Sequence, residues 1–217
     1  MQDLLIDLDN TVYPENSNIF EHIDFRMKKF ISKHLNVSLE EAYQIQKKYF
    51  VENGTTLRGL MLYHNIKPEP FLDYVHDIDL SSIHNNSKLA ILLKNFKGKK
   101  IIFTNGSYSH ATKVLEKVGI KEYIDDIFDI INAKYIPKPN IITYKKVLKK
   151  FNLIPEKTIM IDDLPNNLKT AKELGIYTVL IKHNLEKENN YNYINLICRD
   201  FLETLIQINE GITNENN

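Results

Sequence analysis

Short apolar runs and amphipathic stretches alternate along the second half of the chain. Four apolar runs, rich in Ile, Val or Leu and bounded by polar or turn residues, are predicted to be β-strands: residues 4–8, 100–103, 158–161 and 177–181. Apolar residues recur at helical spacing between the last three runs, in residues 110–119, 141–151 and 168–175. Strands that alternate with helices favour an α/β fold, and we expect a Rossmann-like parallel sheet with helices on both faces.

About ninety residues separate the first two predicted strands, far more than the dozen or so that one crossover needs. This long stretch has helical patterns almost throughout. A capping box, Ser38 with Glu41 three residues later, marks the start of one of its helices. The predicted helices cover residues 17–34, a stretch from residue 39 to about 49, residues 56–64, a segment that begins near Pro68, and residues 88–96.

We therefore predict two domains. Residues 1–13 and 86–217 would form the α/β core, and residues 14–85 would form a helical cap, inserted after the first strand beside the carboxyl-terminal edge of the sheet. At the end of the chain, apolar residues at 194, 197, 201, 205 and 208 predict one docked helix, followed by a frayed end.

Composition excludes several classes of protein. Basic and acidic side chains balance at 28 each, which argues against a nucleic-acid-binding protein. The longest stretch without a charged side chain, residues 101–112, is shorter than the roughly 18 residues of a membrane span, and no apolar leader is visible. Cys198 is the single cysteine, so no internal disulfide can form. We expect a cytoplasmic protein that binds neither nucleic acid polymers nor membranes.

Polar residues that could do chemistry gather where the predicted strands end. Seven of them follow or end these runs, or lie in a Pro-Lys-Pro loop before a helix: Asp7, Asp9, Thr104, Asn105, Lys138, Asp162 and Asp163. Each has a plain structural alternative as a helix cap, a turn residue or a solvated charge. Their joint order favours a functional site, because ligands of parallel α/β sheets bind beyond the carboxyl ends of the strands.

Four carboxylates in one small volume repel one another unless a cation lies between them. Mg²⁺ fits, because it prefers oxygen ligands and keeps waters and substrate phosphate in its shell. The histidines show no zinc-binding spacing. With Mg²⁺ bound, Asp7 could attack phosphorus and form an aspartyl-phosphate. Thr104 and Lys138 would offset charge on the phosphoryl oxygens, and Asp9 would protonate the leaving oxygen and later activate water.

The order Asp-x-Asp-x-Thr, then Thr-Asn, then Lys, then Asp-Asp resembles the haloacid dehalogenase superfamily of phosphatases over essentially the whole chain. Four stretches resemble its pyrimidine 5′-nucleotidase branch more closely: residues 7–14, 54–60, 75–79 and 102–107 together with His110 and Ala111. The resemblance implies that Asp7 is the nucleophile and a Mg²⁺ ligand, and that Asp9 is the acid/base and gives its backbone carbonyl to Mg²⁺. It further implies that the phosphoryl group is bound by Thr104, Asn105 and Lys138.

The last motif shows one departure from the family pattern. The resemblance makes Asp163 a direct metal ligand, with Asp162 beside it as a direct or indirect partner. Many relatives carry a further acid four residues after this Asp, where this chain has Asn167. We expect weaker or altered Mg²⁺ binding rather than lost activity. The helical insertion would be a cap that closes over the site and excludes water.

Three alternatives from other classes fit less well. A receiver module of a signalling protein would place its Thr and Lys after the phospho-accepting Asp, and it has no insertion of this length. A catalytically inactive binding protein has no support, since no essential position is lost. A haloalkanoic dehalogenase needs neither metal nor the second acid, Asp9. A phosphatase or phosphomutase acting on a sugar phosphate is the strongest competitor.

Substrate choice is expected to depend on the cap. Arg58 is a candidate substrate contact because it is one of only three arginines in a lysine-rich chain, and His76 is a weaker one. Four aromatic residues could stack on a base, although helical spacing favours core packing for them: Tyr49, Tyr63, Phe71 and Tyr74. The sequence predicts a Mg²⁺-dependent phosphomonoesterase whose small-molecule substrate is a pyrimidine nucleoside 5′-monophosphate.

Overall fold

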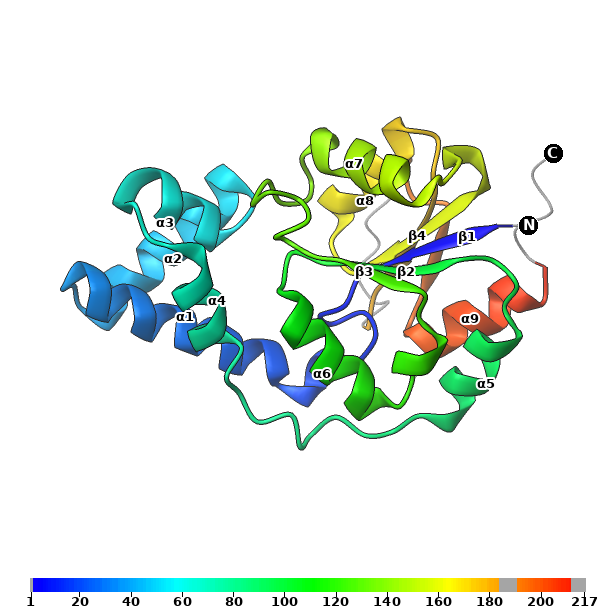
Figure 1. The fold of residues 1–217 in the computed structure, drawn as a ribbon, viewed down its shortest axis with the longest axis horizontal. Coiled ribbons are helices and arrows are strands. Elements are labelled where there is room, and N and C mark those ends of the chain that lie inside the picture. Colours follow the sequence, from blue (N-terminus) through cyan, green and yellow to red (C-terminus); the bar gives the residue numbers. More distant parts are fainter. Residues whose placement is uncertain (1, 184–190, 212–217) are drawn as a thin grey trace.

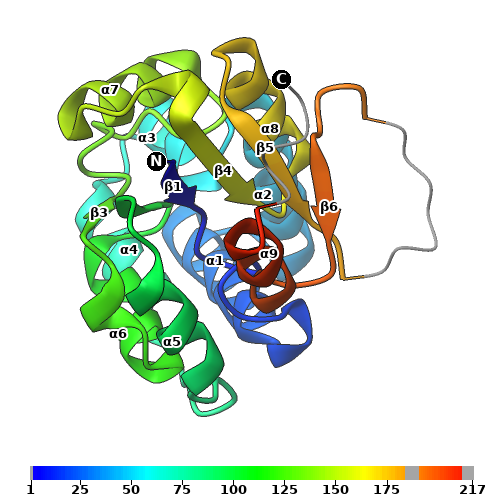
Figure 2. The same ribbon diagram turned by 90° about the vertical axis from the view of Figure 1, so that its right-hand side faces the viewer.

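A computed structural model describes residues 2–183 and 191–211, and in them six parallel strands form one sheet (Figures 1 and 2). The strand order is β3-β2-β1-β4-β5-β6, the order of Rossmann-like sheets, which confirms the predicted fold class. The strands are β1 (Asp3–Ile6), β2 (Lys100–Phe103), β3 (Asp126–Phe128), β4 (Thr158–Asp162), β5 (Tyr177–Ile181) and β6 (Leu196–Cys198).

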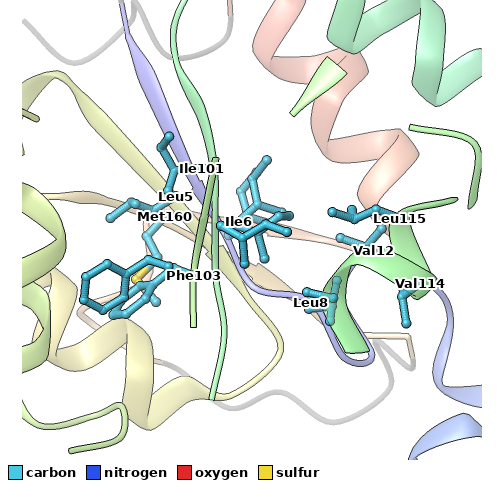
Figure 3. Close-up of a cluster of buried hydrophobic side chains, with 14 of the residues drawn as sticks. Leu5, Ile6, Leu8, Val12, Ile101, Phe103, Val114, Leu115 and Met160 are labelled. Atoms are coloured by element: carbon cyan, nitrogen blue, oxygen red, sulfur yellow. The ribbon is translucent and has the colours of Figure 1, made fainter. Parts of the chain in front are cut away.

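Helices cover both faces of the sheet (Figures 1 and 2). One face carries α7 (Ile141–Phe151) and α8 (Pro165–Glu173), and the other carries α5 (Ser87–Asn95), α6 (Tyr108–Val118) and α9 (Phe201–Asn209). Figure 3 shows the consequence for the core: Leu5, Phe103 and Met160 lie on one side of the central strands, and Val114 and Leu115 of α6 on the other. The central strands are apolar throughout because both of their faces are buried.

Two strands were missing from the sequence prediction. β3 and β6 have three residues each, too few to show an alternating pattern. The single helix predicted over residues 194–208 is therefore wrong in its first half, because Leu196 and Cys198 pair with Val179 and Ile181 of β5. Its second half is confirmed as α9, and the predicted frayed end falls on residues 212–217, outside the described part of the chain.

Four helices follow β1 and lie together beyond the carboxyl ends of the strands (Figure 1). They are α1 (Ile19–Leu35), α2 (Leu39–Asn53), α3 (Thr56–His64) and α4 (Pro68–Val75), and we call residues 14–85 the cap region. The Ser38–Glu41 capping box is present at the start of α2. The division of the chain into a core domain and a cap domain stays a prediction.

Short 3-10 helices cover Glu15–Ser17, Lys121–Tyr123 and Pro155–Lys157. In residues 2–183 and 191–211, no helix is both long enough and apolar enough to cross a membrane.

Candidate active site

The carboxyl ends of β1, β2 and β4 face a cavity of about 230 Å³ whose opposite wall is formed by the cap region. Six of the seven residues predicted to share a site line it: Asp7, Asp9, Thr104, Asn105, Lys138 and Asp163. The seventh, Asp162, ends β4 and lies fully buried against Lys138. β1 is flanked by β2 and β4, and this reversal of strand order is where open α/β sheets bind their ligands.

Lys138 connects two of the carboxylates. Its Nζ donates hydrogen bonds to Asp7 Oδ1 at 2.7 Å and to Asp162 Oδ2 at 2.8 Å. Burial opposes the charge of this side chain, which is only 1% exposed, but the charges of Asp162 and Asp7 raise the pKa of Lys138 above its ordinary value. Lys138 is therefore a fixed positive charge at the cavity wall.

One lysine does not neutralise the whole acidic cluster. Burial raises the pKa of Asp7 to about 7, with Lys138 opposing the shift and the charge of Asp162 adding to it. Burial and the charges of Asp7 and Asp162 raise the pKa of Asp163 to about 9. In the protein alone these carboxyl groups tend to keep protons at neutral pH, and a bound cation would lower both pKa values.

The acidic cluster fits a divalent cation. Asp7, Asp162 and Asp163 each offer an oxygen, and these oxygens lie within 4.8 Å of one another. Mg²⁺ takes such ligands and leaves part of its shell to water and substrate. The raised pKa values of Asp7 and Asp163 are a second sign that this corner of the cavity lacks positive charge. A contribution from the backbone carbonyl of Asp9 stays a prediction.

Asp162 and Asp163 differ in their surroundings. Asp162 accepts hydrogen bonds from Lys138 Nζ, from the Leu164 backbone N–H at 2.9 Å, and from Asn167 Nδ2 at 2.9 and 3.1 Å. Within the described residues Asp163 forms no ion pair, and it keeps some exposure to the cavity. Asp163 is therefore the better placed metal ligand, and Asp162 holds Lys138 in position.

The same contacts explain Asn167. Its amide donates to both oxygens of the buried Asp162 carboxylate, whereas an acid at this position would repel that carboxylate. The expected effect of Asn167 on Mg²⁺ affinity stays a prediction.

Two side chains contact the Asp9 carboxylate, and the sequence motifs did not predict either contact. Tyr13 donates its hydroxyl hydrogen to Asp9 Oδ1 at 2.6 Å, and His110 Nε2 lies 2.8 Å from the same oxygen. Burial opposes ionisation of Asp9, but His110 and the hydrogen bond from Tyr13 lower its pKa to about 2. Both partners belong to motifs seen in the sequence. Ser107 caps α6, which places His110 in the first turn of this helix, beside Asp9.

Thr104 and Asn105 use their side chains differently. Thr104 Oγ1 accepts a hydrogen bond from the Gly106 N–H at 2.9 Å, which leaves its own hydroxyl hydrogen for a phosphoryl oxygen. The Asn105 side chain pairs with the backbone of Lys138, with Oδ1 accepting at 2.8 Å and Nδ2 donating at 3.2 Å. Asn105 thereby fixes the Lys138 loop, and its predicted contact with phosphate stays a prediction.

The structure separates the two substrate candidates of the cap region. His76 lines the cavity, stacks on His110 with ring centres 4.3 Å apart, and contacts Ser107 Oγ through Nδ1 at 3.0 Å. Burial and the neighbouring His110 lower the pKa of His76 to about 3, so it is neutral. Arg58 is half-buried on α3 and is not among the residues that line the cavity.

The aromatic residues at the cavity also differ from those the sequence suggested. Phe71 is the only one of the four candidates that lines it. Tyr49 packs beside Gly59 and contacts His64, and Tyr74 lies under Arg26. Phe20 and Phe50 line the cavity instead, and their helical spacing gave no indication of this.

Comparison of the sequence with known families agrees with this geometry. The family model of the haloacid dehalogenase-like hydrolases matches residues 4–175. A glyceraldehyde 3-phosphate phosphatase of Methanocaldococcus jannaschii is 29% identical over 203 residues, which cover 82% of this chain and 83% of the relative. Phosphate metabolism protein 8 of Saccharomyces cerevisiae is 26% identical over 212 residues, 89% of this chain and 64% of the relative. The family model and both relatives agree with the resemblance to the haloacid dehalogenase superfamily. Neither of these two relatives is named as a pyrimidine 5′-nucleotidase.

The fold also resembles a solved structure over nearly its whole length. A HAD phosphatase from Thermococcus onnurineus superposes with a TM-score of 0.61 at 18% sequence identity, covering 97% of each chain. At this identity the similarity concerns the fold.

Proposed function

The chain belongs to the haloacid dehalogenase-like hydrolase family, and from this premise we propose that it is a Mg²⁺-dependent phosphomonoesterase that works through an aspartyl-phosphate on Asp7. The observation that carries the proposal is the grouping of Asp7, Asp9, Asp163 and Lys138 on one cavity, with Lys138 2.7 Å from Asp7. Asp7 and Asp163 would hold Mg²⁺, which would supply positive charge for the phosphoryl oxygens.

The residues of the chain divide the reaction between them. Lys138 holds Oδ1 of Asp7, and Thr11 donates a hydrogen bond to Oδ2 at 3.3 Å. Oδ2 would attack phosphorus, which forms the Asp7–phosphorus bond and breaks the bond to the leaving oxygen. Asp9 gives its proton to that oxygen. In the second step Asp9 takes a proton from water, the water oxygen bonds to phosphorus, and Asp7 is released.

Asp9 must carry a proton to act as the acid, although its pKa in the free protein is about 2. A bound phosphate adds negative charge beside this carboxylate and raises its pKa. We therefore expect Asp9 to take up its proton when the substrate binds.

The substrate we propose is a pyrimidine nucleoside 5′-monophosphate. The opening motif at residues 7–14 supports this branch. Three aromatic side chains of the cap wall support it too, because Phe20, Phe50 and Phe71 line a space where a base could lie. A second candidate is glyceraldehyde 3-phosphate, which the name of the Methanocaldococcus jannaschii relative favours.

Phosphate release from a panel of substrates distinguishes the two. The panel comprises UMP, CMP, glyceraldehyde 3-phosphate, several sugar phosphates and p-nitrophenyl phosphate, compared by kcat/KM with Mg²⁺. We expect UMP or CMP to exceed the sugar and triose phosphates. A preference for glyceraldehyde 3-phosphate would refute the pyrimidine assignment and keep the phosphomonoesterase, whereas no turnover of any ester would refute both.

The proposal includes closure of the cap region, residues 14–85, over the cavity. Contacts between the two regions that support it are Ser107 with His76 and the Tyr135 hydroxyl with Glu69 at 2.9 Å. Such closure would exclude water while the aspartyl-phosphate exists.

A further inference from the structure

The cap wall of the cavity contains a buried amide side chain that the proposed chemistry does not use. Gln46 on α2 is 2% exposed and lines the cavity. Its Nε2 donates a hydrogen bond to Asp24 Oδ1 at 2.8 Å. Within residues 2–183 and 191–211, its Oε1 has no hydrogen-bond partner. Buried polar atoms almost always have a hydrogen-bond partner, so an unpaired oxygen here indicates a donor that the protein alone does not supply.

The orientation of the Gln46 amide follows from its neighbours. An ionised Asp24 carboxylate only accepts hydrogen bonds, so the group facing it must be the NH₂ of Gln46 and the free atom must be the carbonyl oxygen. Lys47 Nζ donates to the same Asp24 oxygen at 2.7 Å and balances its charge. The Thr56 hydroxyl donates to the Gln46 backbone carbonyl and ties α3 to this turn of α2. The Gln46 amide is therefore held in place, and the charges of Asp24 and Lys47 beside it cancel.

The surroundings of Gln46 restrict the chemical group that could meet it. Beside Gln46 the cap wall carries a group of apolar side chains together with the polar Asp24, Lys47, Thr55, Thr56 and His76. The apolar group includes Phe20, Ile23, Met27, Phe50, Phe71 and Leu72. The apolar side chains offer no partner to a hydroxyl group, so the part of a ligand that lies against them should be apolar. A flat ring with an apolar face and one N–H at its edge matches both these apolar side chains and the unpaired oxygen of Gln46.

We propose that Gln46 is a specificity-determining residue whose Oε1 accepts a hydrogen bond from an N–H of the substrate's base. The inference rests on the proposed phosphomonoesterase function and deepens it by naming the part of the leaving group that the cap region recognises. The imide N–H is the only donor of the uracil ring, and the exocyclic amine fills this role in cytosine.

The experiment compares UMP with its N3-methyl derivative, in which the imide hydrogen is replaced. The wild-type protein is expected to prefer UMP by about tenfold in kcat/KM, the range for one neutral hydrogen bond in a closed site. In Gln46→Leu the UMP value should fall by about the same factor, and the ratio of the two substrates should approach one. Turnover of p-nitrophenyl phosphate, which has no such donor, should fall by less than turnover of UMP.

Gln44→Leu is the matched control, because Gln44 lies on the same helix and is exposed, with its side chain paired to Glu40. It should keep the wild-type ratio. If Gln46→Leu does not fold, Gln46→Met, which keeps the length of the side chain, takes its place.

The outcomes separate this inference from the proposed function. Equal kcat/KM for UMP and its N3-methyl derivative in the wild-type protein would overturn the inference, as would an unchanged ratio in the Gln46 variant. Either result with normal p-nitrophenyl phosphate turnover leaves the phosphomonoesterase standing. Absence of turnover of every ester by the wild-type protein would refute the function itself.

Discussion

At the scale of single residues, the site is a set of carboxylates whose protonation is set by their neighbours. Asp7 and Asp9 are two residues apart, yet their pKa values shift in opposite directions, to about 7 and about 2. The two pKa values differ because of the partners of each carboxylate. Lys138 is shared between Asp7 and Asp162, whereas His110 and Tyr13 both contact Asp9. The sequence predicted both acids, but their partners depend on which side chains the fold turns toward them.

His110 tests the role of Asp9. In His110→Gln, Asp9 loses a fixed neighbour, so protonation of the leaving oxygen should become slower, by about ten- to a hundredfold in kcat for an alkyl phosphate. Nitrophenolate needs little protonation, so the loss with p-nitrophenyl phosphate should be smaller, and KM should change little. His84→Gln, at an exposed position of the cap region that does not line the cavity, is the control. Equal losses on both substrates would mean that His110 serves only the fold.

At the scale of elements, the strongly periodic segments were predictable and the short ones were not. The bounds predicted for β2, β5, α3 and α7 match the structure, because each carries a clear apolar pattern. β3 and β6 were missed, since strands of three residues owe their existence to a neighbouring strand rather than to their own sequence. The motif residues could be placed on strand ends, but the cavity residues Phe20, Phe50 and Gln46 depend on how helices pack.

The turn between α2 and α3 approaches the Lys138 loop closely. Gly54 has φ +81°, and a Cβ there would lie 3.1 Å from Pro137 Cγ and 3.2 Å from the Lys138 carbonyl oxygen. Gly54→Ala should therefore cost about 1 kcal/mol of stability through backbone strain and also displace Lys138, which lowers kcat. Thermal unfolding and p-nitrophenyl phosphate turnover measure the two effects.

Gly175→Ala supplies the matched control for this turn. Gly175 has φ +86°, but a Cβ there would lie 3.6 Å from its nearest neighbour, Glu156 Oε1, so only the backbone strain should appear. Equal activity of the two variants would show that the turn does not position Lys138.

At the scale of the whole molecule, the acidic cluster links metal binding, protons and stability. The pKa values of Asp7 and Asp163 rise from 3.8 to about 7 and about 9 in the metal-free fold. Between about pH 4 and pH 9 the folded protein thus holds more protons than the unfolded chain, and this contribution to stability falls as pH rises. Mg²⁺ replaces those protons, so it should stabilise the protein more at high pH than at low pH.

Unfolding temperatures with Mg²⁺ and with EDTA, measured from about pH 5.5 to about pH 8.5, test this linkage. The shift caused by Mg²⁺ should grow with pH and should shrink in Asp163→Asn. A shift of the same size at every pH would contradict the assigned protonation of the cluster.

The most direct test of the central claim is turnover of p-nitrophenyl phosphate by Asp7→Asn in the presence of Mg²⁺. Because Asp7 is buried and holds a proton readily, a neutral Asn should fold, whereas it cannot form the aspartyl-phosphate. Asp3→Asn, on the same strand but away from the cavity, should keep full activity. We predict that Asp7→Asn loses activity by about a thousandfold or more, as expected when a nucleophile is removed. Turnover at the wild-type rate would contradict the account.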